Sequence, residues 1–148
     1  MTKDKPVVTQ RLEAVLKRVF LEFDFFEALS RMGYDDDQIE QLSRDVVAQL
    51  CEEIVTILKA YARAHGHAMG WDMVERWFGL LRERPEFLSQ IGEDYRLTPA
   101  QVAYRVESVF RLFRNPQNWQ SISHTIADEI SAVVGALKDP NSATKFAR

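Results

Sequence analysis

The chain has 148 residues, of which 46% are hydrophobic and 11% aromatic, a composition that excludes an intrinsically disordered chain and suffices for one domain with its own core. Its formal net charge of −3 makes nucleic acid an unlikely partner, because nucleic-acid binding usually needs a basic surface. Cys51 is the single cysteine, which excludes an intramolecular disulfide and a multi-cysteine zinc site. The polar N-terminus and the lack of a long apolar run predict a cytoplasmic protein with no membrane span.

Apolar residues recur at spacings of three and four along nearly the whole chain, and no segment alternates as a strand does. This pattern predicts an all-α fold, with residues 1–148 forming a single helical bundle of about six helices. We expect residues 1–7 and 139–148 to be flexible tails. The first two helices should span about 8–32 and 37–65, each roughly twice the average helix length, and should form a long antiparallel hairpin.

The middle of the chain predicts two shorter helices. Asp72 followed by Glu75 is a capping pattern, which predicts a third helix after a connection at 64–71 that contains two glycines. Pro85 should interrupt this helix and open a brief fourth one, which Gly92 closes.

The last third of the chain carries the clearest local signal. Thr98 has the spacing of an N-cap, Pro99 takes the first helical position, and Gln101 completes a capping box. This motif predicts a fifth helix, which ends where Asn115-Pro116 breaks the pattern. A sixth helix should continue to Asp139-Pro140.

The first predicted helix carries more apolar surface than one packing contact needs. Its second half has an apolar stripe outside the expected core face. Two interpretations remain open: later helices cover this stripe at the centre of the bundle, or it is an interface for a partner or a second copy. The candidate interface residues are Leu21, Phe25, Leu29 and Met32.

The histidines offer no clear metal site. His65 and His67 form a His-x-His pair at a helix end, but no acidic residue or cysteine lies close in sequence to complete a ligand set, and Asp72 is the nearest acid. We expect both histidines to have structural roles, and no metal or cofactor to be bound.

The segment around His124 reads Ile122-Ser123-His124-Thr125-Ile126, followed by Ile130, Ala132 and Gly135. This motif resembles the phosphoacceptor helix of sensor histidine kinases over fewer than twenty residues. The family normally has an acid after the histidine and a proline a few residues later, where this chain has Thr125 and Glu129. The resemblance therefore implies at most passive phosphotransfer, and we expect His124 to be structural.

No nucleophile elbow and no glycine-rich phosphate loop occur in the sequence. The leading hypothesis is a non-enzymatic helical protein-protein interaction module of the adaptor, small regulatory subunit, chaperone or inhibitor type, binding a protein partner or forming a homodimer through helix one. The alternative is a small-molecule binder or enzyme with an interhelical pocket. Its candidate ligand-binding residues are His65, Trp71, Trp77 and His124.

Overall fold

The structure is a computed structural model that describes residues 5–20 and 23–138. Within these ranges the chain forms eight helices and no strand, which confirms the all-α fold. In chain order the helices are α1 (Val7–Val19), α2 (Phe25–Arg31), α3 (Asp36–Asp45), α4 (Val47–Ala64), α5 (Ala68–Phe78), α6 (Leu88–Tyr95), α7 (Pro99–Arg114) and α8 (Pro116–Lys138). None of them combines the length and the apolarity that a membrane crossing requires.

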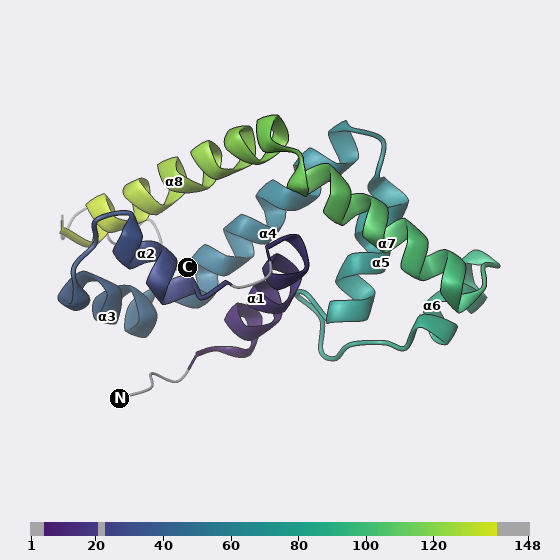
Figure 1. The fold of residues 1–148 in the computed structure, drawn as a ribbon. Helices are drawn as coiled ribbons and strands as arrows, with labels where there is room; N and C mark the ends of the chain where they lie inside the picture. The colour runs from purple at the N-terminus through teal and green to yellow at the C-terminus, as the bar shows by residue number, and fades with distance from the viewer. Residues whose placement is uncertain (1–4, 21–22, 139–148) are drawn as a thin grey trace.

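Four helices, α1, α4, α5 and α7, pack around the centre of the core. Aromatic rings fill this centre: the Trp71 and Phe113 rings meet edge to face with centroids 6.0 Å apart, and Phe78 meets Phe110 in the same way at 5.9 Å. Helix α8 lies along α4, and α6 packs against α5 and α7. Figure 1 shows α2, α3 and the C-terminal half of α8 at one end of the molecule and α6 at the other.

The expectation of one helix over 8–32 is wrong. Helix α1 ends at Val19, Phe20 has an extended backbone, and α2 begins at Phe25. Asp24 caps the new helix, because its Oδ1 accepts a hydrogen bond from the N–H of Glu27 at 3.0 Å. Asp24 and Glu27 have the same three-residue spacing as Asp72 and Glu75, so the sequence contains a capping signal for the start of α2.

The second expected helix is also divided. It begins with a capping box formed by Asp35 and Gln38: Asp35 Oδ1 accepts the Gln38 N–H at 2.8 Å, and Gln38 Oε1 accepts the Asp35 N–H at 2.9 Å. The backbone leaves helical geometry at Val46, so α3 and α4 are separate helices. Because both long helices are divided, the described part of the chain has eight helices instead of about six, and the long N-terminal hairpin is not confirmed.

Helix α5 begins at Ala68, four residues before the predicted start, and includes Gly70. A Cβ atom at Gly70 would lie 2.7 Å from Val109 Cγ2 and 3.2 Å from the carbonyl oxygen of Arg105, both in α7. This glycine is therefore a close contact between two helices and not part of a loop.

The later helices follow the prediction more closely. Helix α6 begins at Leu88 and continues through Gly92, where we expected it to end. Helix α7 begins at Pro99 behind the predicted cap, with Thr98 Oγ1 accepting the Gln101 N–H at 3.1 Å. The break at Asn115 is confirmed, since α8 starts at the next residue.

Candidate functional site

An apolar pocket of about 150 Å³ lies between α1, α2, α4 and α8. Helices α2 and α8 contribute most of its wall, and α1 and α4 contribute one residue each. The lining residues are Leu16, Phe23, Phe25, Ala28, Leu29, Met32, Ile54, Trp119, Ser123, Ile126, Ala127 and Ile130.

The surface of this pocket is almost entirely hydrocarbon. Its single hydroxyl, on Ser123, lies 3.2 Å from the Gln120 carbonyl oxygen, to which it donates a hydrogen bond. Among the described lining residues none is charged. Met32 is 43% exposed while Leu29 is 1% exposed, so the lining runs from buried core to surface along α2. The pocket can therefore bury an apolar group, and its described lining residues include no acidic or basic side chain.

A buried carboxylate on α1 fixes the start of α2, and with it one wall of the pocket. Glu13 is 7% exposed, and its Oε2 accepts a hydrogen bond from the Phe25 N–H at 2.6 Å. The ammonium of Lys5 lies 2.9 Å from the same oxygen and 3.0 Å from Asp24 Oδ2. The carboxylate of Glu13 thus joins three segments: Lys5 before α1, α1 itself and the start of α2.

The pKa values around this cluster reflect the pairing. Burial raises the pKa of the Asp24 carboxyl, but the Glu27 N–H and the Lys5 ammonium outweigh burial and bring its pKa below the ordinary value. Burial lowers the pKa of Lys5, but the two carboxylates outweigh it and raise the pKa above the ordinary value. Both groups therefore hold their charges at neutral pH.

The four residues of the expected interface have different positions. Phe25 and Leu29 are buried within their own chain, where they line the pocket, and Met32 lies partly exposed. Leu21 lies outside the described residues. Phe25 and Leu29 thus belong to the hydrophobic core of their own chain, whereas Met32 reaches the surface.

The candidate ligand-binding residues are not brought together at this pocket. Trp71 is buried in the core and donates its indole N–H to Glu75, and Trp77 is half-buried under the Arg18 guanidinium, 5.4 Å from the ring centroid. Neither of them lines the pocket.

The histidines are likewise outside the pocket. His65 is exposed, and it stacks on Tyr61 with ring centroids 4.2 Å apart. His124 is also exposed, with its Nε2 3.7 Å from Asp128 Oδ2. Within the described ranges no three or more His, Cys, Asp or Glu side chains form a group that could hold a metal ion.

Sequence reasoning missed the contribution of α8 to the pocket. Trp119, Ile126 and Ile130 are spaced by seven and four residues, which places them on one apolar face of α8. Periodicity shows which face of a helix is apolar, but not which other helix it meets. The sequence therefore indicates that each wall of the pocket is apolar, but it does not indicate that α2 and α8 lie against the same pocket.

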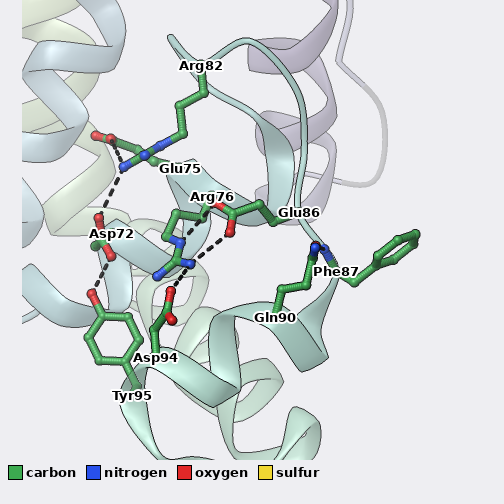
Figure 2. A network of polar contacts seen from close by, with 9 residues as sticks. All are labelled: Asp72, Glu75, Arg76, Arg82, Glu86, Phe87, Gln90, Asp94 and Tyr95. Atoms are coloured by element: carbon green, nitrogen blue, oxygen red, sulfur yellow. Dashed lines mark hydrogen bonds and ion pairs between the residues drawn. The ribbon is translucent and has the colours of Figure 1, made fainter.

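A second cluster of polar side chains joins α5, the loop 79–87 and α6 (Figure 2). Arg76 donates to both carboxylate oxygens of Glu86, at 2.9 and 2.8 Å, and also to Asp94. This pairing raises the pKa of Arg76 further and lowers the pKa of Glu86. The arrangement attaches the loop to two helices.

The rest of this network is also fully paired. Arg82 Nη2 lies 3.2 Å from Asp72 Oδ1 and 3.5 Å from Glu75 Oε1. Burial, and then the hydrogen bond that Tyr95 donates to Asp72, raise the pKa of Tyr95 to about 12. Tyr95 therefore stays protonated at neutral pH, and the network fits a structural clamp better than an acid–base site. Phe87, 76% exposed, points away from it (Figure 2).

No protein-family model, curated protein or solved structure matches this chain. The fold and the site define it as an all-helical protein with a small apolar pocket between helices.

Proposed function

We propose that this chain is a non-enzymatic helical interaction module that binds one apolar side chain of a partner protein in the pocket between α2 and α8. The observation that carries the proposal is the combination of the pocket's size, about 150 Å³, with its hydrocarbon lining. Interfaces gain much of their affinity from single apolar or aromatic anchors buried in pockets of this kind.

The volume favours a side chain over a whole small molecule. Pockets for drug-sized ligands and cofactors measure about 300–1,000 Å³. An apolar cavity of about 150 Å³ accommodates a single benzene ring. A Phe or Leu side chain from a partner has this size, and its backbone would remain outside.

The lining chemistry also favours binding over catalysis. The described lining residues include no titratable side chain, and the polar network on α5 and α6 has its acids paired with arginines or a tyrosine. A hydrocarbon wall can hold an apolar group but cannot move a proton or stabilise a developing charge. An apolar molecule of about one ring is the second candidate occupant, because the same lining and size would suit it.

A homodimer through helix one receives less support. Phe25 is 3% exposed and Leu29 is 1% exposed, so these two residues offer almost no surface to a second copy. Only Met32 of the described stripe residues remains substantially exposed. One partly exposed side chain falls far short of a standard interface of about 800 Å² per partner.

The test is a titration of the isoleucine methyl signals by nuclear magnetic resonance. Ile126 and Ile130 line the pocket, whereas Ile39 and Ile91 lie in other parts of the core. The neutral peptide Gly-Ser-Phe-Ser-Gly should shift the first two signals and leave the last two in place. Gly-Ser-Ala-Ser-Gly should shift none of them. Since burying one side chain gains only about 1.5–3 kcal/mol, we expect weak binding, in the millimolar range or above.

A matched pair of variants tests whether the peptide binds in the pocket. Ala127→Leu places extra carbon in the pocket and should abolish the shifts, whereas Ala132→Leu, at an exposed position on the same helix, should not. Benzene serves as a separate probe for the second candidate. If benzene shifts Ile126 and Ile130 while the phenylalanine peptide does not, the site takes a small molecule and the proposal is wrong.

A further inference from the structure

The part of the chain that forms the α2 wall of the pocket is strongly acidic. Residues 24–45, which include α2 and α3, hold seven acidic residues against two arginines, a formal charge of −5. The acidic residues are Asp24, Glu27, Asp35, Asp36, Asp37, Glu40 and Asp45, and the arginines are Arg31 and Arg44. Helix α8, the other wall of the pocket, adds Asp128 and Glu129 against Lys138 and brings the charge of these elements to −6.

The remaining described residues have the opposite sign. Residues 5–20, 23 and 46–115 hold ten acidic and thirteen basic residues, a formal charge of +3. Charge is therefore segregated along the molecule: α2, α3 and the C-terminal half of α8 lie at one end, and α5, α6 and most of α7 lie toward the other (Figure 1). The overall charge of −3 conceals this difference.

Part of the acidic charge is not neutralised locally. Glu27 pairs with Arg31, and Asp24 pairs with Lys5. Among the described residues, Asp36, Asp37 and Glu40 of α3 form no ion pair, and all three are exposed. Helix α3 packs against α2, so this charge lies on the helix next to the pocket wall. At physiological ionic strength such charges act over about 8 Å, and over longer distances at low salt.

We infer that the partner of this pocket is a basic segment, in which the anchoring apolar residue is flanked by Lys or Arg. The inference rests on the proposed function and adds the partner's charge to it. The apolar pocket supplies the contact, and the acidic surroundings attract and orient a cationic chain. An acidic partner is repelled by the same field.

The experiment compares two charged peptides by the same methyl titration. Lys-Lys-Phe-Lys-Lys should shift Ile126 and Ile130 at concentrations about tenfold lower than Glu-Glu-Phe-Glu-Glu in about 20 mM NaCl. In about 300 mM NaCl the difference should shrink to about threefold or less, because salt screens the field. Lys-Lys-Ala-Lys-Lys, with the charge but no anchor, should leave the pocket signals unchanged.

Charge variants test whether the acidic residues of α3 cause the preference for the basic peptide. Neutralising α3 with Asp36→Asn, Asp37→Asn and Glu40→Gln should weaken the lysine peptide about threefold or more at low salt. The control removes exposed acidic charges from the loop 79–87 and from α6, with Glu83→Gln and Glu93→Gln, and should have less effect for each charge removed.

The outcomes separate the two proposals. If the acidic peptide binds as well as the basic one at low salt, or if the α3 variant binds the lysine peptide unchanged, the partner is not basic, although the pocket still binds an apolar side chain. If neither charged phenylalanine peptide nor the neutral one shifts Ile126 and Ile130, the proposed function itself is wrong.

Discussion

The side chain of Glu13 and the backbone of Phe25 are joined by a buried hydrogen bond of 2.6 Å. This contact connects α1 to the first residue of α2 across the division of the expected first helix. It also places the Phe25 ring in the wall of the pocket. The buried carboxylate of Glu13 in α1 thus helps to hold the start of α2 in place.

We expect Glu13→Leu to destabilise the protein by about 1–3 kcal/mol, because it leaves the buried Phe25 N–H without an acceptor. Glu13→Gln should cost less, since its amide oxygen can still accept that hydrogen bond while only the charge facing Lys5 is lost. Urea denaturation followed by circular dichroism measures both changes. Equal losses for the two variants would show that the ion pair, and not the hydrogen bond, is the important contact.

Phe25→Asp should unfold the chain rather than separate a dimer. Phe25 is 3% exposed in the single chain, so the new carboxylate would be buried without a partner. Circular dichroism should show a loss of helix, and size-exclusion chromatography of the unmodified protein should show one chain. A variant that stays folded while the unmodified protein is a dimer would restore the interface hypothesis.

Thr98→Ala should cost about 1 kcal/mol by removing the N-cap of α7. The Thr98 hydroxyl accepts the Gln101 N–H at 3.1 Å, and the Gln101 side chain accepts the Thr98 N–H at 2.8 Å. Thermal or urea unfolding gives the comparison, with Ser121→Ala on the exposed face of α8 as the control. No difference between the two variants would mean that the cap contributes nothing to stability.

Cys51 should be almost unreactive in the folded protein. It is fully buried, and burial raises the pKa of its thiol to about 11, although the hydrogen bond with Thr9, 3.2 Å away, acts in the opposite direction. Little thiolate therefore exists at pH 8. Labelling with a disulfide reagent should be slow in buffer and fast in denaturant. Fast labelling of the native protein would indicate that α1 and α4 separate readily.

The ion pair between Arg76 and Glu86 should make part of the stability depend on acidity. Arg76 lowers the pKa of Glu86 below its ordinary 4.5, so the unfolded chain binds this proton more readily than the folded one. The contribution is complete above the ordinary pKa and is lost as the pH falls through the folded value. Glu86→Gln should show a smaller decrease in unfolding free energy between pH 6 and pH 3 than the unmodified protein. Identical slopes would contradict this assignment.

Local signals in the sequence determined the helical class and several boundaries. The start of α7 at Thr98 and Pro99 and the break at Asn115 were predicted correctly. Each depends on neighbouring residues alone: an N-cap satisfies N–H groups within one turn, and proline restricts the residue before it. Such features favour the same local backbone structure in any tertiary structure.

The tertiary structure decided the rest, because these features depend on residues distant in sequence. Gly70 resembled a loop residue in the sequence, but its missing side chain lets α5 and α7 approach closely. Phe25 and Ile130 belong to two apolar faces more than a hundred residues apart, which form one pocket only when α2 and α8 pack together. Hydrophobic burial is not directional, so the apolar pattern specified what would be buried, and the packing of whole helices selected the partner faces.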